Sequence, residues 1–171
     1  MSAFIPRVLA LCAATLAILV SCSSSTLSGP PTLRVGRDEC AACGMIINEA
    51  RSACSILIES GGRREHLLFD DIGCMLDHER DGHIDATVCE RHVRDYSSQA
   101  WIAAHTASYL MADSKLLLTP MGSGIASFAD RADAARLQSS KPGRVLTWTE
   151  LVPARQAWME ERYGKPSRPG G

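Results

Sequence analysis

The sequence lacks the features by which several large classes of protein are recognised. It has no basic patch or run, because 18 Lys and Arg are balanced by 19 Asp and Glu. Nucleic-acid binding therefore has no electrostatic basis. A nucleophile–base pair and a Gly-rich phosphate loop are also missing, which argues against an enzyme. The 5 His show no i, i+4 pairing on one helix, so a histidine metal centre is not expected.

A long apolar run is missing as well, since the run over residues 8–20 is too short to span a bilayer as a stable helix. Together with Arg7 it has the form of a signal peptide over residues 1–21. The run ends in Leu19-Val20-Ser21-Cys22, which resembles a bacterial lipobox. The resemblance implies a diacylglyceryl thioether and an acylated amino group on Cys22. Two or more acyl chains anchor a protein stably.

We therefore expect a lipid-anchored protein on the periplasmic side of a membrane. Ser23 stands where an acidic residue is associated with inner-membrane retention, which favours the outer membrane. An ordinary secretory signal cleaved near the same place is the alternative, and it also puts the protein outside the cytoplasm. Without the signal peptide the count is 17 basic against 19 acidic side chains, because Arg7 is the one charged residue removed.

The remaining chain divides into three parts. Residues 22–32 are rich in Ser, Gly and Pro and predict a flexible tether. Residues 164–171 predict a disordered tail. Residues 33–163 are the folded part, long enough for one compact core or two small lobes.

The folded part predicts an α+β protein with a repeated strand–strand–helix–strand unit. An Asp pair at 70–71 predicts an N-cap for a helix over 72–80, and the Phe-Ala-Asp sequence at 128–130 predicts the start of another over 130–138. Two small related lobes are expected, over about 33–96 and 97–163. The expected strands are 52–58, 65–69, 86–93, 101–105, 109–112, 125–128 and 144–149.

Sulfur is concentrated at three places beside glycine or proline. These are the motifs Cys-Ala-Ala-Cys-Gly-Met at 40–45, Gly-Cys-Met at 73–75 and Thr-Pro-Met-Gly at 119–122. Thiolate and thioether donors select Cu(I) over hard cations. The alternative for each single residue is packing, because Met fills gaps in cores and Cys packs like a small hydrophobe. Packing is the expectation for Cys74 and Met75.

Of 7 cysteines, Cys12 leaves with the signal peptide and Cys22 carries the lipid. The odd number that remains leaves at least one thiol unpaired in an oxidising compartment. Three uses of Cys40 and Cys43 stay open. They are a structural disulfide or zinc knuckle, a thioredoxin-like redox motif, and metal ligation by Cys43 with Met45. The segment after Cys43 is typical of a turn entering a strand, whereas the redox motif requires a helix N-terminus.

The three sulfur motifs, in this order, resemble those of the NosL family over residues 38–151. The matching segments are Cys-x-x-Cys-Gly-Met at 40–45, Leu-Phe-Asp-Asp-Ile-Gly-Cys-Met at 68–75 and Thr-Pro-Met-Gly-x-Gly-Ile-x-x-Phe at 119–128. The resemblance implies two related lobes and a bound Cu(I). It also implies delivery of copper to the catalytic cluster of nitrous oxide reductase, through periplasmic maturation proteins and their membrane transporter.

The resemblance places ligands on Cys43, Met45 and Met121. We expect Cys43 to be the thiolate anchor, and Cys40 to be an extra ligand or a disulfide partner that blocks the site. Asp70 and Asp71 are expected to cap the helix, and Asp71 to orient a partner near the copper site. The roles of Cys54 and Cys89 are not set by the family pattern.

Two other functions are weighed against a copper chaperone. One is a periplasmic thiol–disulfide oxidoreductase that uses Cys40 and Cys43. The other is a structural lipoprotein stapled by disulfides. Because Met121 belongs to the second lobe, the copper site is expected to exist only when the lobes are docked, and their opening is expected to release copper.

Overall fold

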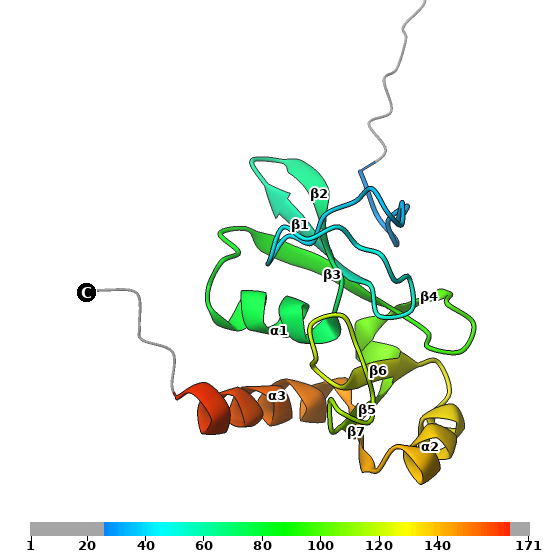
Figure 1. Cartoon of the computed structure of the whole chain (residues 1–171). Helices are drawn as coiled ribbons and strands as arrows, with labels where there is room; N and C mark the ends of the chain where they lie inside the picture. The colour runs from blue at the N-terminus through cyan, green and yellow to red at the C-terminus, as the bar shows by residue number, and fades with distance from the viewer. Residues whose placement is uncertain (1–25, 165–171) are drawn as a thin grey trace, which may run out of the picture.

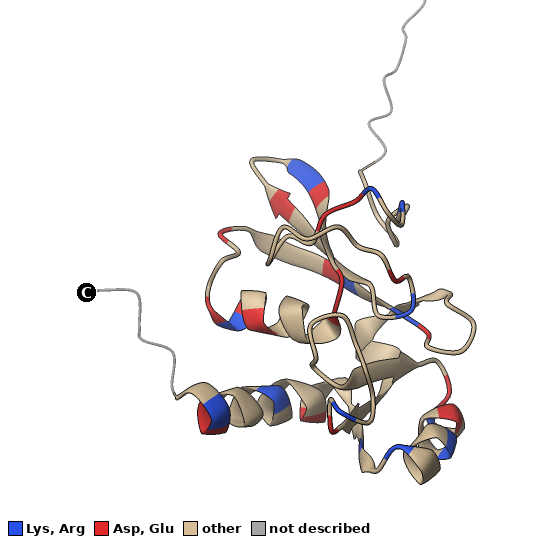
Figure 2. Ribbon diagram, in the orientation of Figure 1, with Lys and Arg blue, Asp and Glu red and all other residues tan. Residues whose placement is uncertain are grey.

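The computed structural model describes residues 26–164 (Figure 1). The expected signal peptide, the lipidated Cys22 and the expected tail from 165 onward lie outside these residues. Within the described range, no helix combines the length and the apolar character needed to cross a bilayer. Basic and acidic side chains are interspersed over the described elements (Figure 2).

Helices and strands alternate in the α+β arrangement expected from the sequence. The elements are β1 (Cys54–Ser60), β2 (Arg63–Phe69), α1 (Ile72–Arg80), β3 (Thr87–Arg94), β4 (Trp101–Ala103), η1 (Ala104–Thr106), β5 (Ser108–Ala112), β6 (Ile125–Phe128), α2 (Arg131–Ser140), β7 (Gly143–Thr147) and α3 (Trp148–Tyr163).

The predicted repeat of strand, strand, helix and strand is confirmed. The first unit forms an antiparallel sheet in the order β2-β1-β3-β4, and the second forms one in the order β6-β5-β7. In each unit the first strand is central, with the second and third strands on either side of it. The connecting helices are capped in the same way: the Asp71 carboxylate accepts from the Gly73 amide, and the Asp130 carboxylate from the Ala132 amide.

Two expectations about the second unit are wrong. The sequence pattern assigns the strand beginning at Trp101 to the second unit, but β4 pairs with β3 in the first sheet. The closing strand is expected to reach Thr149, but it ends at Thr147, where α3 begins. The sequence contains a signal for α3, because the Thr147 and Glu150 side chains form a capping box. Pro153 within the helix and its weak apolar periodicity obscure that signal.

The two sheets share one apolar core. Figure 1 shows α1 between the first sheet and α3, and α1 contacts both. The sheets are also joined by backbone, because Asp95 at the end of β3 forms a parallel bridge to Ser127 in β6. Fully buried members of this shared core come from both units: Ile56, Phe69, Met75 and Val93 from the first, and Tyr109, Ile125, Leu146 and Leu151 from the second.

Residues 26–32 form no helix or strand, but they contact the outer side of the first sheet. The Gly29 amide donates to the Glu90 carboxylate of β3 at 2.9 Å. The Leu27 carbonyl accepts from the Arg64 side chain of β2 at 3.3 Å. The last part of the expected tether therefore lies against the folded domain.

Candidate metal centre

Residues 40–45 form a tight loop closed by their own backbone. The Cys40 amide donates to the Met45 carbonyl at 2.8 Å, and the Gly44 amide donates to the Cys40 carbonyl at 2.8 Å. Gly44 has φ +72°, in the left-handed region that favours glycine. An antiparallel bridge between Glu39 and Ile46 closes the base of the loop. The predicted turn is therefore confirmed, but the strand expected after it is reduced to this single bridge, and the first strand begins at Cys54.

One further hydrogen bond holds this loop against the junction between β2 and α1. The Ala41 amide donates to the Leu68 carbonyl at 2.7 Å, close to the end of β2. As a result, ligand atoms of Cys40, Cys43 and Asp70 all lie within 4.8 Å of one another. Cys43 is exposed, whereas the other two are buried. Two sulfurs and a carboxylate thus share a position that opens to solvent on the Cys43 side.

Asp70 has a different surrounding from the one expected for a helix cap. Its side chain is buried, and its Oδ1 has no hydrogen-bond partner among the described residues. Burial, and then contact with Cys40, raise the pKa of Asp70 to about 7. A buried carboxylate is costly unless it is paired or coordinates a metal. A cation between Asp70 and the two cysteines would supply the missing partner, so this donor set fits a metal.

Cys74, in the first turn of α1, extends the cluster. Its interaction with Cys40 lowers the pKa of Cys40 against the opposing effect of burial. The same interaction raises the pKa of Cys74. Partial burial raises the pKa of Cys43.

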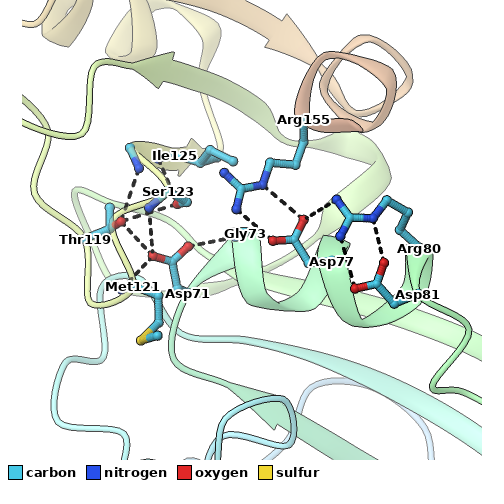
Figure 3. Close-up of polar contacts among 11 residues, drawn as sticks. Asp71, Gly73, Asp77, Arg80, Asp81, Thr119, Met121, Ser123, Ile125 and Arg155 are labelled. Atoms are coloured by element: carbon cyan, nitrogen blue, oxygen red, sulfur yellow. Dashed lines mark hydrogen bonds and ion pairs between the residues drawn. The ribbon is translucent and has the colours of Figure 1, made fainter. Parts of the chain in front are cut away.

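Asp71 ties the second unit to this cluster (Figure 3). One carboxylate oxygen caps α1, and the other accepts from the Thr119 hydroxyl at 2.7 Å and the Met121 amide at 3.0 Å. The Ser123 amide approaches the same oxygen at 3.4 Å. These bonds hold the Met121 loop against the residue that directly follows Asp70. Both Asp71 oxygens are therefore engaged within the chain, and the expectation that Asp71 orients a partner stays a prediction.

The two methionines of the expected ligand set are both accessible. Met45 is 48% exposed and Met121 is 44% exposed. Figure 3 shows the Met121 side chain extending from its loop, away from the hydrogen bonds around Asp71. Neither methionine fills a core, so packing does not account for them. By contrast Met75 is fully buried, as expected of a packing residue.

Sequence reasoning found Cys40 and Cys43 but not the contributions of Asp70 and Cys74. Both residues reach the site through the packing of the loop on the β2–α1 junction, which no local pattern encodes. The sequence does hold a partial signal for Asp70. Asp71 alone caps α1, so the second aspartate of the pair is not needed as a cap. The remaining thiol of the first sheet's core, Cys54, is fully buried in β1.

The surroundings of Cys40 and Cys43 argue against the alternatives of a disulfide and a redox motif. All five described cysteines are free thiols. Cys40, whose pKa is lowered, is only 2% exposed, and Cys43, which is exposed, has a raised pKa. Reactive redox cysteines combine a lowered pKa with accessibility. In this loop the two properties are on different residues, and the pair does not begin a helix.

Comparisons with known proteins agree with this architecture. The family model described as NosL matches residues 33–155. The crystal structure of the copper chaperone NosL from Shewanella denitrificans is similar in fold, with a TM-score of 0.55 and 22% sequence identity. The match covers 71% of this chain and 96% of that chain. A comparison with curated proteins gave no match.

Proposed function

Because the chain belongs to the NosL family, we propose that it is a copper chaperone that binds Cu(I) as cargo. The observation that carries the proposal is the cluster of Cys40, Cys43 and Asp70, with ligand atoms within 4.8 Å of one another. The similar fold of a copper chaperone supports it. In this proposal Cys43, Met45 and Met121 hold the ion on the open side, with Cys40 behind them.

The exposure of three of these ligands is suited to a chaperone. Cys43, Met45 and Met121 all lie on loops and are accessible to solvent. A partner's ligands could therefore replace them one at a time, which a closed tetrahedral site does not permit. Thioethers add no charge and bind no proton at neutral pH, so they reduce the pH dependence of copper affinity. The ion is held by soft donors yet remains transferable.

We propose that the movement that releases copper is in the loops, because the two units share one apolar core. Separation of the two units would expose Tyr109 and Ile125, which are buried among first-unit residues. It would also break the ion pair between Arg155 of α3 and Asp77 of α1. Displacement of residues 40–45 or 119–123 exposes far less apolar surface. Loop movement therefore replaces lobe opening as the proposed release step.

A second part of the proposal concerns the protein that receives the copper, called the client below, and the location of the chaperone. We place the protein on the periplasmic side of a membrane, anchored through Cys22 in the outer membrane. Its client is the catalytic copper centre of nitrous oxide reductase, reached through the maturation and transporter proteins of that system. It has no enzymatic activity of its own in this proposal. The exposed Cys43 side of the site is where a recipient would take the ion.

Copper titration tests the binding proposal. The reduced protein is titrated anaerobically with Cu(I) in the presence of a coloured Cu(I) chelator. We expect it to withdraw a single equivalent from the chelator, and Cys43→Ser to lose most of this capacity. Cys89→Ser is the matched control, because Cys89 lies in β3 and belongs to none of the loops that form the cluster. A parent protein that withdraws no copper would refute the proposal.

The client is tested genetically. Loss of the gene is expected to leave nitrous oxide reductase protein without its catalytic copper cluster, while a copper-containing terminal oxidase keeps its metal. The opposite pattern would assign the terminal oxidase as client. Complementation with Cys22→Ala tests the anchor, because the lipid is predicted to be attached to that cysteine.

The runner-up function, a thiol–disulfide oxidoreductase, has one observation in its favour, the lowered pKa of Cys40. The burial of Cys40, which is only 2% exposed, argues against this function, because an attacking thiolate must reach its substrate. Measurement of insulin disulfide reduction separates the two functions. Activity that requires Cys40 would support the oxidoreductase.

A further inference from the structure

Cys74 lies beside the cysteine cluster. Its interactions with Cys40 and with the carboxylate of Asp70 act to lower the pKa of both groups. Asp70 is buried, and one of its oxygens lacks a partner among the described residues. Cys74 thus interacts with two members of the group whose ligand atoms converge within 4.8 Å.

The same cysteine also lies beside the Met121 loop. Cys74 and Met121 line one surface cavity together. The close approach depends on the preceding residue, because a Cβ on Gly73 would lie 2.5 Å from the Ser123 Cβ. Glycine at this position therefore lets the first turn of α1 pack directly against the loop. Cys74 therefore lies beside the loop that carries the expected methionine ligand.

We propose that Cys74 is a further cysteine ligand of the Cu(I) site, so that Cys40 and Cys74 form its inner side. This inference rests on the proposed copper chaperone function and names a ligand that the family resemblance does not assign. On binding, the Cys74 thiol loses its proton to solvent through the cavity that it lines, and its sulfur forms a bond to Cu(I). The positive end of the α1 dipole lies beside this sulfur and offsets part of the added negative charge.

The inner pair gives the site two sides with different tasks. Cys40 is buried and Cys74 is partly buried, and these two residues hold the ion when no partner is present. Cys43, Met45 and Met121 are exposed and are replaced first by a recipient's ligands. The ion would then leave from the inner thiolates last. Stepwise exchange of this kind needs soft donors on both sides of the ion.

Cysteine labelling of the unaltered protein tests the proposal directly. The reduced protein is treated anaerobically with iodoacetamide, with and without one equivalent of Cu(I), and each cysteine is quantified by peptide mass spectrometry. Cys74 is partly exposed and is expected to be alkylated in the metal-free form and protected in the copper form. Cys89, equally partly exposed, is the internal reference and is expected to react alike in both forms.

A variant pair supplies the second measurement. Cys74→Ser is expected to weaken Cu(I) binding about 10- to 100-fold in the chelator competition, and Cys89→Ser to leave it unchanged. Equal labelling of Cys74 in both forms, with unaltered affinity in Cys74→Ser, would overturn this inference while the copper-binding function stands. Failure of the parent to bind Cu(I) would instead refute the proposed function. If Cys74→Ser does not fold, the labelling result on the parent decides.

Discussion

Substitution of Asp71 by Asn separates the two tasks of this carboxylate. One oxygen caps α1, and the other holds the Met121 loop. Asn caps helices about as well as Asp, so the cap survives. The side-chain amide then faces the Thr119 hydroxyl and the Met121 amide with a nitrogen in place of an oxygen. The variant therefore releases the loop from the cluster but leaves α1 in place.

The expected cost follows from the bonds that are lost. The hydrogen bonds from Thr119 and Met121 are 2.7 and 3.0 Å long, whereas that from Ser123 is weak at 3.4 Å. A hydrogen bond to a charged group contributes about 1.5–3 kcal/mol, and Asn retains part of the contact with the Thr119 hydroxyl. We expect Asp71→Asn to lower the free energy of unfolding by about 2–4 kcal/mol. Loss of such an outer contact is expected to weaken Cu(I) binding about 10- to 100-fold.

Urea unfolding and Cu(I) competition measure the two effects. The matched control is Asp130→Asn, because Asp130 caps α2 at the equivalent place in the second unit and is exposed. We expect this control to change neither the stability nor the copper affinity by a measurable amount. A destabilised Asp71→Asn variant that binds Cu(I) as tightly as the parent would refute the reasoning, because the loop position would then not matter to the ion.

Three other predictions concern the loop, the contact between helices and acid stability. Gly44→Ala is expected to cost about 1–2 kcal/mol in urea unfolding, because φ is +72° there, and to weaken Cu(I) binding. Arg155→Met is expected to cost about 2–3 kcal/mol, since it leaves the Asp77 carboxylate of α1 without its 2.7 Å partner; an unchanged urea midpoint would contradict this. Burial raises the pKa of Asp95, but hydrogen bonds led by that from Ser98 outweigh it, so its pKa is lowered from 3.8. The Asp95 carboxylate therefore stabilises the fold above the pKa that it has in the unfolded chain, and this stabilisation is lost as the pH falls through its lower pKa in the folded protein. Asp95→Asn should accordingly lose less stability than the parent between about pH 5 and about pH 3.

Local signals in the sequence were sufficient for the repeated units. The Asp71 cap and the stop after Arg80 delimit α1 correctly, because capping and termination depend on neighbouring residues. The strand with which β4 pairs is set by contacts between segments distant in the sequence. The local pattern therefore assigns β4 to the second unit, whereas it pairs with β3 of the first. The helix α3 was missed although Thr147 and Glu150 form a readable capping box.

The candidate site was predictable only in part, for the same physical reason. Cys40, Cys43 and Met45 lie within one short loop, so their proximity follows from the sequence. Asp70 and Cys74 reach them because the loop packs on the β2–α1 junction. That packing is a tertiary contact, and no spacing in the sequence reports it.

The central claim is that thioethers from both units ligate the same Cu(I) as Cys43. X-ray absorption at the copper edge of the Cu(I)-loaded protein tests it most directly when every methionine is replaced by selenomethionine. The account predicts scattering from two selenium neighbours, reduced to one in each of the variants Met45→Leu and Met121→Leu. Copper bound with no selenium neighbour would contradict it.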